Sequence, residues 1–408
     1  MNIIFKKIFL SFFANKSFVG RLEIADIDNK KYVFGEALGA SNMPRADIKI
    51  IDSSFYKKVV LYGDIGLGEA YFLGYFETAD LKILLKWFID NQENMPSFQE
   101  TKNSSSLFEW AKIPSRFFHY LNKNTKKGSK RNIKKHYDVS NDFYKLWLDE
   151  TMTYSSAIFL GDESLYEGQI NKYERICEKL GLRESDTVLE IGSGWGGFSI
   201  YAAKKYGCKI KTVTISQEQY DYTREKITKE GLDSKIEILL QDYRDLKGDF
   251  DKIVSIEMME ALGHEFVPLF VNKCNELLRP GGKICYQCIT FPDKFFKKYL
   301  KDNNYIKKHI FPGGELISLG NLKDVLEETR LLKIMSVESI GIDYAKTLRK
   351  WRKNLLDKKD KVFSIGFDEE FIKKWLYYFY YCEVGFEEKY LEDVQILIEK
   401  KTKEANQK

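Results

Sequence analysis

The sequence predicts an α/β protein built on a mostly parallel, doubly wound sheet, with a smaller α+β domain before it. Three observations carry this prediction. Strand-like and helix-like segments alternate from about residue 166 to residue 290, which is typical of a parallel sheet. A glycine-rich turn at 192–197 joins an apolar strand to a helix. The composition changes over residues 96–135, which separates this region from shorter strand-like segments before it.

The first 120 residues predict the α+β domain. Two strands around an Asp-Asn turn are expected in GRLEIADIDNKKYVFG, residues 20–35. Residues 46–77 are expected to add more short elements, punctuated by Gly63, Gly66, Gly68 and Gly74. The apolar spacing of residues 79–92 predicts an amphipathic helix. Residues 1–20 favour a short helix, packed on the domain or resting on a membrane, over a signal peptide.

Residues 121–135 form a basic linker between the two predicted domains. The segment LNKNTKKGSKRNIKK contains seven Lys and Arg residues and no acid. It can serve as a solvated tether, or it can be attracted to anionic lipid head groups. Contact with RNA is less favoured, because no aromatic side chains alternate with the charges.

The predicted catalytic region, residues 136–400, alternates strands and helices in order. A helix from about residue 165 ends at Gly181, and another ends at Gly207. Strands are expected at 187–191, 209–215, 235–240, 250–256 and 283–290, and further helices at 217–229 and 264–278. Residues 291–408 hold more helix than strand, including an aromatic-rich helix over 371–390.

Composition excludes several classes of protein. The net charge of +5 is too small for a dedicated nucleic-acid coat protein, so no nucleic-acid partner is expected. Six scattered cysteines do not make a disulfide scaffold, and four histidines without ligand spacing predict no metal site. Cys285 and Cys288 should point to opposite faces of one strand. No stretch is apolar enough to span a membrane. The expected compartment is the cytoplasm, because residues 1–20 favour a short helix over a signal peptide.

The glycine turn is the strongest local indication of a ligand. Glycines allow positive φ and close approach of the backbone, and a helix N-terminus follows them. A dehydrogenase would carry an acid at the end of the second strand, but the sequence there is TVTISQEQ. Glu190 with the three glycines after it instead resembles motif I of Rossmann-like methyltransferases, whose loop holds S-adenosylmethionine. The alternative is a tight turn that binds nothing.

A longer set of segments resembles the cyclopropane-fatty-acyl-phospholipid synthase family, of the mycolic acid cyclopropane synthase type. These segments are HYDVSNDFYKLWLDETMTYSSAIF, LEIGSGWGGF, TISQEQ, LQDYRDL, DKIVSIEMMEALGHEF and YIKKHIFPGGELIS, with GDIGLGEAYFLGYFE in the first domain. The resemblance spans roughly residues 20–395. It implies a Rossmann-like class I methyltransferase domain that transfers the S-adenosylmethionine methyl to a cis double bond of a phospholipid acyl chain, forming a cyclopropane.

The resemblance also implies the site residues. The catalytic set, which holds a bicarbonate ion as the base, is Ser156, Glu260, Gln287, Ile289 and Tyr344. Glu260 would orient the ion and accept its proton, Tyr344 would donate a hydrogen bond, and Ile289 would contribute its backbone. The cofactor set is Tyr154, Ser155, Glu190, Gly192, Gly194, Trp195, Gly196, Thr214, Ser216, Gln219, Asp242 and Tyr243, with Asp242 facing the adenine.

Two departures from the family leave the product open. Ser156 and Gln287 stand where well-known members have Cys and His, although both can still hydrogen-bond an anion. Loss of a different proton would give a methylene or methyl-branched chain instead of a cyclopropane. A non-catalytic lipid-binding protein is a third alternative, disfavoured because the glycines and Glu260 are present.

The expected partner is an unsaturated phospholipid in an anionic membrane surface. Residues 291–314 mix aromatic and lysine side chains, which would face an acyl chain and phosphates, or would form only a packing helix. The expected protein is therefore cytoplasmic and peripherally membrane-associated. Homodimerisation through the N-terminal domain is expected by family analogy alone.

Overall fold

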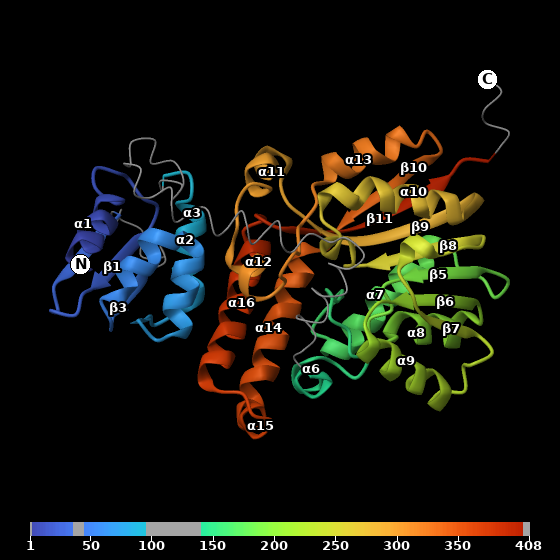
Figure 1. Cartoon of the computed structure of the whole chain (residues 1–408), viewed down its shortest axis with the longest axis horizontal. Coiled ribbons are helices and arrows are strands. Elements are labelled where there is room, and N and C mark those ends of the chain that lie inside the picture. Colours follow the sequence, from blue (N-terminus) through green and yellow to red (C-terminus); the bar gives the residue numbers. More distant parts are fainter. Residues whose placement is uncertain (1, 36–44, 95–139, 403–408) are drawn as a thin grey trace. The chain divides into compact units, whose positions relative to one another are not determined.

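The structure, a computed structural model, describes residues 2–35, 45–94 and 140–402. The predicted basic linker at 121–135 lies outside the described residues. The chain divides into two compact units (Figure 1). The first contains Met1–Tyr120 together with Asn303–Ile310 and Lys358–Glu388, and the second contains the remainder. The sequence predicted two contiguous domains, 1–120 and 136–400, whereas the structure assigns these two later segments to the first unit.

The first unit has the predicted α+β character. Its sheet has the order β2-β1-β3-β4, formed by β1 (Arg21–Ala25), β2 (Lys31–Phe34), β3 (Arg45–Ile50) and β4 (Phe76–Glu77). The expected hairpin is confirmed, with Asn29 at a φ of 61° in the turn between β1 and β2. The predicted amphipathic helix is α3 (Leu81–Asp90), capped by Asp80. Helix α1 (Asn2–Ser11) packs on the unit through buried Phe9, whose ring contacts Phe55 and Tyr56.

The expectation of several short elements punctuated by glycines is confirmed in part. Short strands β3 and β4 lie at the two ends of residues 46–77, and the helical residues Ser54–Phe72, labelled α2, are interrupted at Gly63, where φ is 57° and ψ is −127°. Two of the glycines serve close packing instead of turns. A Cβ at Gly66 would lie 2.0 Å from the Lys58 carbonyl oxygen, and a Cβ at Gly68 would lie 2.3 Å from the Tyr305 ring. Gly66 and Gly68 therefore lie inside a helix, although glycine's preference for turns predicts that the helix ends there.

Helices α12 (Tyr305–His309), α15 (Lys359–Ser364) and α16 (Glu369–Glu387) complete the first unit. The predicted aromatic-rich helix is α16. The Tyr305 ring on α12 lies 4.5 Å from the ring of Tyr377 on α16. Lys308 pairs with Glu69, whose carboxyl oxygen lies 2.5 Å from its Nζ, and Lys307 is buried.

The second unit holds a seven-stranded sheet of order β10-β11-β9-β8-β5-β6-β7 (Figure 1). The strands are β5 (Thr187–Ile191), β6 (Lys209–Thr214), β7 (Ile236–Leu240), β8 (Phe250–Ile256), β9 (Leu278–Thr290), β10 (Leu332–Ser339) and β11 (Glu392–Lys400). Strands β5 to β9 pair in parallel, whereas β11 pairs antiparallel with both β9 and β10. This is the predicted doubly wound sheet, extended by an antiparallel edge.

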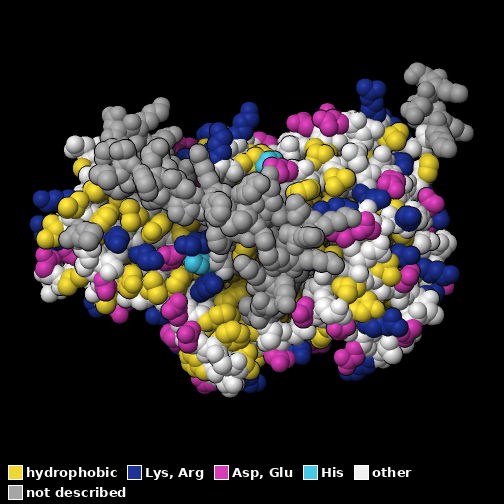
Figure 2. All heavy atoms as spheres, viewed as in Figure 1, with side chains coloured by type: hydrophobic (Ala, Val, Ile, Leu, Met, Phe, Trp, Pro, Cys, Tyr) yellow, Lys and Arg dark blue, Asp and Glu magenta, His cyan; other side chains and the backbone are white. Residues whose placement is uncertain are grey.

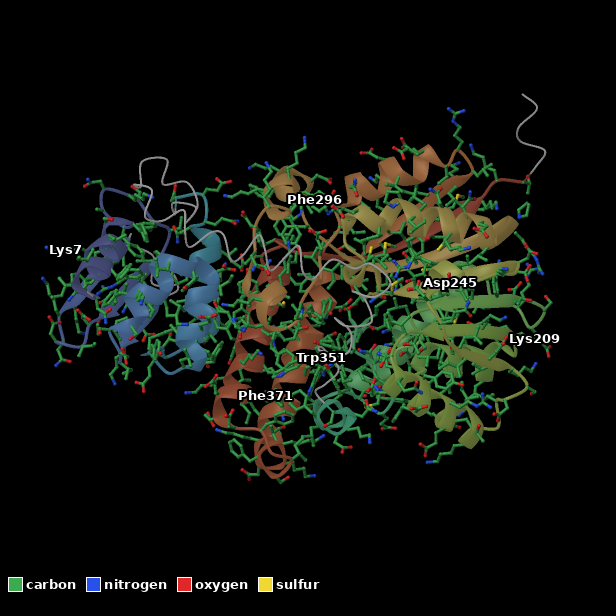
Figure 3. The ribbon with its side chains drawn as sticks, in the orientation of Figure 1. Lys7, Lys209, Asp245, Phe296, Trp351 and Phe371 are labelled. Atoms are coloured by element: carbon green, nitrogen blue, oxygen red, sulfur yellow. The ribbon has the colours of Figure 1, made fainter. Side chains whose placement is uncertain are left out.

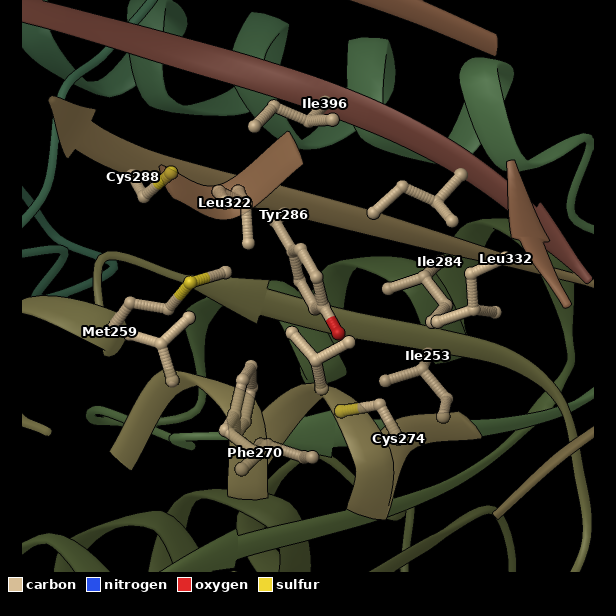
Figure 4. Close-up of a cluster of buried hydrophobic side chains, with 14 of the residues drawn as sticks. Ile253, Met259, Phe270, Cys274, Ile284, Tyr286, Cys288, Leu322, Leu332 and Ile396 are labelled. Atoms are coloured by element: carbon tan, nitrogen blue, oxygen red, sulfur yellow. The ribbon is translucent and has the colours of Figure 1, made fainter. Parts of the chain in front are cut away.

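Each face of this sheet has its own hydrophobic core. Helices α7 (Leu165–Leu180), α8 (Gly197–Tyr206) and α9 (Gln217–Lys229) supply one core. Helices α10 (Val267–Leu277) and α13 (Leu319–Glu328) supply the other, seen around Tyr286 and Phe270 in Figure 4. Cys285 packs in the first core and Cys288 in the second, which confirms that their side chains point to opposite faces.

The remaining elements of this unit are α6 (Asn141–Trp147), α11 (Asp293–Tyr299) and α14 (Gly341–Asp357). Phe296 on α11, labelled in Figure 3, is buried with Phe291 and Tyr299 in a small cluster, against which Tyr390 packs. These aromatic side chains therefore form the packing arrangement that the sequence left as an alternative to an acyl-facing one. No helix among the described residues has the length and apolar character needed to cross a bilayer.

The contact of Gly68 with Tyr305 and Tyr377 yields a testable prediction. A methyl at position 68 would lie 2.3 Å from the Tyr305 ring and 2.9 Å from the Tyr377 ring. We expect Gly68→Ala to lower the free energy of unfolding by about 1–3 kcal/mol, because the crowded rings must shift. Urea unfolding of the full chain measures this. Gly161→Ala is the control, since nothing lies within 4 Å of its Cβ, and equal stability of the two variants would contradict the prediction.

Candidate active site

The predicted site residues lie along the carboxyl edge of the parallel strands. The chain passes from β5 to β6 and β7 on one side, then returns to β8 and β9 on the other. The strand order therefore reverses beside β5. Ligands of open α/β sheets bind in the crevice outside the strand ends at such a reversal.

The glycine loop after β5 has the backbone that the sequence predicts. Gly192, Gly194 and Gly196 adopt φ values of 99°, 48° and 84°, which residues other than glycine rarely adopt. The Gly192 and Ser193 amides donate to the Val213 carbonyl at 3.0 and 2.9 Å, which ties the loop to β6. A Cβ at Gly194 would meet nothing within 4 Å, so the backbone there faces open space. The loop fits a ligand that approaches its backbone and the N-terminus of α8.

Glu190 lies beneath this loop, in the core. Its carboxylate accepts hydrogen bonds from the Ser199 and Thr212 hydroxyls, the latter at 2.6 Å. Burial raises the pKa of Glu190 to about 7, against the effect of these two donors. The side chain therefore links β5, β6 and α8 under the loop, and supports the loop from below.

The residues after β6 form a local network. The Thr214 hydroxyl donates to Gln219 Oε1 at 2.8 Å, and the Ser216 amide donates to Thr214 Oγ1 at 3.1 Å. Ser216 also caps α9, since its Oγ accepts from the Gln219 amide. These three cofactor candidates thus come together at one strand end, each with a buried side chain.

The two candidates after β7 take different positions. The Asp242 carboxylate accepts from its neighbour Arg244, with Oδ2 2.6 Å from Nη2. Tyr243 packs into the core, where its ring lies edge-on to Phe270 at 5.3 Å. The expected adenine-facing acid is at the strand edge, whereas Tyr243 has a packing position.

Aromatic rings gather beside the loop. Trp195 is buried and donates from Nε1 to Asn141 Oδ1 at 2.9 Å. The partly accessible Tyr154 lies 5.2 Å from Trp147 and 5.3 Å from Trp351, the latter on α14 and labelled in Figure 3. Aromatic faces attract cations, so this cluster suits chemistry that develops positive charge.

All five predicted catalytic residues come together at the ends of β8 and β9. The Ile289 amide donates to Glu260 Oε1 at 2.5 Å. Ser156, Gln287 and Tyr344 instead meet at a residue that sequence reasoning missed, Glu257. It comes directly after β8, in the same SIEMME segment as Glu260.

The Glu257 carboxylate accepts three hydrogen bonds. The Ser156 amide and Gln287 Nε2 donate to Oε1 at 2.7 and 2.9 Å, and the Tyr344 hydroxyl donates to Oε2 at 2.7 Å. The Ser156 hydroxyl points elsewhere, to the Ala157 carbonyl at 3.0 Å. Thus it is the Ser156 backbone, and not its side chain, that reaches the predicted anion position.

Three more residues that sequence reasoning missed complete the cluster. Asp393 on β11 accepts from Gln287 Nε2 at 3.2 Å, and Gln395 Nε2 donates to Gln287 Oε1 at 3.0 Å. Lys172 on α7 is buried and donates to Ser155 Oγ at 2.7 Å. No motif in the sequence marks these residues, because they reach the cluster only through the pairing of β11 with β9 and the burial of Lys172.

The electrostatics favour negative charge on Glu257 over its neighbours. Burial raises the pKa of all three carboxyls, Glu257, Glu260 and Asp393. For Glu260 the value reaches about 8, with the nearby Glu257 charge as the second cause. Glu257 alone has three donors, and it is also attracted to Lys172. Hydrogen bonds to a carboxylate favour its charged form, so Glu260 and Asp393 are the groups held neutral.

A bicarbonate ion does not fit the position that the family resemblance assigns to it. Three of the five expected donors and acceptors already hold the Glu257 carboxylate. Among the residues that the structure describes, Glu260 Oε2 and Asp393 Oδ1 have no hydrogen-bond partner. The three donors that would hold the ion are therefore already taken up by the Glu257 carboxylate.

Comparison with known proteins gives relatives over most of the chain. The tuberculostearic acid methyltransferase of Mycobacterium tuberculosis is 34% identical over 374 residues, covering 89% of this chain and 86% of the relative. The cyclopropane-fatty-acyl-phospholipid synthase of Escherichia coli K12 is 33% identical over 346 residues, covering 84% of each protein.

Solved structures and a family comparison agree with these relatives. A mycolic acid cyclopropane synthase complexed with SAH and CTAB superposes with a TM-score of 0.62 at 30% identity, over 66% of this chain and 98% of that one. Residues 124–396 match the family described as mycolic acid cyclopropane synthetase. The fold is therefore Rossmann-like, as predicted. The chain belongs to the mycolic acid cyclopropane synthetase family, whose members are S-adenosylmethionine-dependent fatty acid methyltransferases.

Proposed function

We propose that this protein transfers the methyl group of S-adenosylmethionine to the cis double bond of an unsaturated phospholipid acyl chain, and that proton loss then closes a cyclopropane ring. One observation carries the proposal. A carboxylate held by three donors stands next to a glycine loop of cofactor-binding shape, since the Met258 side chain that follows Glu257 would lie 3.1 Å from a Cβ at Gly192. Methyl addition to an alkene requires both parts, a methyl donor and a base.

The cofactor supplies an electrophilic methyl group on a sulfonium. The loop residues Gly192, Gly194 and Gly196 would hold it through their backbone, with Thr214, Ser216 and Asp242 at the neighbouring strand ends. A related structure is complexed with SAH at 30% identity, which supports this placement.

The residues around the base must protect a cation from water. Methyl addition to an isolated double bond leaves a carbocation on the acyl chain, which water would quench. Trp195 and Tyr344 are buried, and Tyr154 and Trp351 place further aromatic rings in the same unit. Such rings exclude water and favour positive charge nearby.

A second product is favoured by a specific relative. The tuberculostearic acid methyltransferase matches 89% of this chain. Loss of a different proton from the same cation gives a methylene, or a methyl branch on a chain that keeps a double bond, without any change in the methyl transfer. A saturated methyl branch would also require a hydride donor. The departures at Ser156 and Gln287 lie at the carboxylate that would accept the proton.

We also propose that the substrate is reached at an anionic membrane surface, with the protein peripherally bound. On α15, Phe363 is 39% exposed, and Lys359 Nζ lies 5.5 Å from the Phe363 ring centroid. Figure 2 shows hydrophobic side chains at the surface in the region of α15 and α16. Exposed aromatic groups beside lysines suit a lipid interface. Homodimerisation stays a prediction from the family resemblance.

The central prediction concerns lipid mass. Full-length protein incubated with S-adenosylmethionine and vesicles of unsaturated, anionic phospholipid should add one CH2 unit to the acyl chains, as measured by mass spectrometry. Gas chromatography of the fatty esters then separates cyclopropane from methylene and methyl-branched products. Vesicles of saturated phospholipid serve as the control and should stay unchanged. Unchanged mass of the unsaturated lipid would overturn the proposed function.

Glu260 provides a second prediction. Glu260→Gln should lower turnover by roughly 10²-fold, because an amide cannot pass on to solvent the proton that the neighbouring base has accepted. Cofactor binding, measured by calorimetry, should stay as in the wild type. Glu276→Gln on the exposed end of α10 is the matched control and should keep full turnover. Normal turnover of Glu260→Gln would remove Glu260 from the reaction.

A further inference from the structure

Glu257 is held in an unusual backbone conformation. Its φ is 46°, in the left-handed region that residues other than glycine rarely adopt. Its amide donates to the Gln287 carbonyl at 2.7 Å, so β9 fixes the position of the residue. Strained backbone of this kind persists where surrounding contacts enforce it, and it is common at functional sites. Here the conformation directs the carboxylate into the cluster formed by Ser156, Gln287 and Tyr344.

The three donors around Glu257 are the ones that the family resemblance assigns to a bicarbonate ion. A side-chain carboxylate and bicarbonate present the same planar pair of acceptor oxygens. Oε1 takes the Ser156 amide and the Gln287 amide group, and Oε2 takes the Tyr344 hydroxyl. The side chain thus satisfies every donor that a bound ion would need at this point.

Resting on the function proposed above, we infer that the Glu257 carboxylate replaces the bicarbonate ion and is itself the catalytic base, so that turnover requires no bicarbonate. The surroundings support this assignment. Ser156 and Gln287 are buried, whereas Glu257 as a whole residue is only partly buried. A base must be reachable by the acyl chain in this way.

The chemical step balances with the residues present. The C–S bond breaks with its electron pair going to sulfur, and the alkene π pair forms the new C–C bond. The cation on the adjacent carbon then takes the electron pair of a C–H bond of the new methyl, which closes the ring. The released proton goes to the Glu257 carboxylate, which becomes a neutral acid and later returns the proton to solvent. No oxidant or further co-reactant is required.

The charge distribution agrees with this role. Three hydrogen bonds and buried Lys172 favour the ionised form of Glu257, which is the form that accepts a proton. Glu260 has a pKa raised to about 8, mainly by burial and then by the Glu257 charge, so it is largely neutral at pH 7 and does not compete as the base. A base fixed to the backbone also avoids the entropic cost of capturing an ion for each turnover.

The first test needs no variant. Turnover of the full-length wild type is measured in CO2-free buffer and again after bicarbonate is added. We expect equal rates. A rate that falls on removal of bicarbonate and recovers on its return would overturn the inference while leaving the proposed function intact. Wild-type protein that forms no product under either condition would overturn the proposed function, and this inference with it.

Two substitutions at one position sharpen the test. Glycine accepts the φ of 46°, so Glu257→Gly removes the carboxylate without backbone strain and empties its place among the three donors. Its turnover should fall by roughly 10²-fold, and added bicarbonate should restore at least about tenfold. Glu257→Gln is the matched control, since the amide fills the same space and bicarbonate should restore nothing. Rescue of both variants, or of neither, would contradict the inference.

A binding measurement separates the role of Glu257 from activity. ¹³C-labelled bicarbonate observed by NMR should show binding to Glu257→Gly and none to the wild type or to Glu257→Gln. Cofactor affinity, measured by calorimetry, should be equal in all three proteins, which reports that each is folded. Binding of labelled bicarbonate to the wild type with similar affinity would show that the ion has its own place, and would overturn the inference.

Discussion

The structure of the site depends on placing three carboxyl groups in one small, largely buried region. Burial of a charge without partners costs several kcal/mol, so the surrounding elements must supply donors or hold the acids neutral. The Ser156 backbone, Gln287 on β9 and Tyr344 on α14 all serve one carboxylate, that of Glu257. Lys172 supplies the buried positive charge, and burial lowers its own pKa to about 8. Glu260 and Asp393 pack beside this charge as acids with raised pKa values.

The same arrangement couples the base to the cofactor loop. Glu257 and Met258 are consecutive, and the Met258 side chain packs against Gly192. Gly192 in turn is hydrogen-bonded to Val213 on β6, and Glu190 fastens β5, β6 and α8 below. Neighbouring parallel strands therefore set the distance between methyl donor and base. The catalytic chemistry needs a fixed distance of this kind, because a small error in the position of reacting groups lowers the rate steeply.

Local sequence patterns predicted most strands and helices of the second unit, but few of the contacts between residues far apart in the sequence. The strands and helices from 165 to 256 were predicted because the spacing of apolar residues indicates their type, and glycines such as Gly181 and Gly207 mark where helices end. Helix α2 was missed because Gly66 and Gly68 serve close packing, which depends on partners elsewhere in the chain. Asp393 was missed because it reaches the site only through the pairing of β11 with β9, where it lies opposite Ile289. Glu257 was overlooked because its position in the site depends on a left-handed φ, which the presence of a glutamate in the sequence does not predict.

A base that is a side chain of the protein, and not a bound ion, also affects which product forms. An ion among several donors can shift with the substrate, whereas the Glu257 carboxylate is confined by its φ, by its amide bond to Gln287 and by three donors. The proton that leaves is then decided by how the acyl chain lies against a fixed base. Removal of a proton from the new methyl closes the ring, and the same base gives a methylene when the positive charge first moves to the carbon bearing that methyl. The relatives named for cyclopropane and for tuberculostearic acid products are thus compatible with one methyl transfer. The side chains that position the acyl chain then select ring closure or a methylene, and a saturated methyl branch needs a hydride donor in addition.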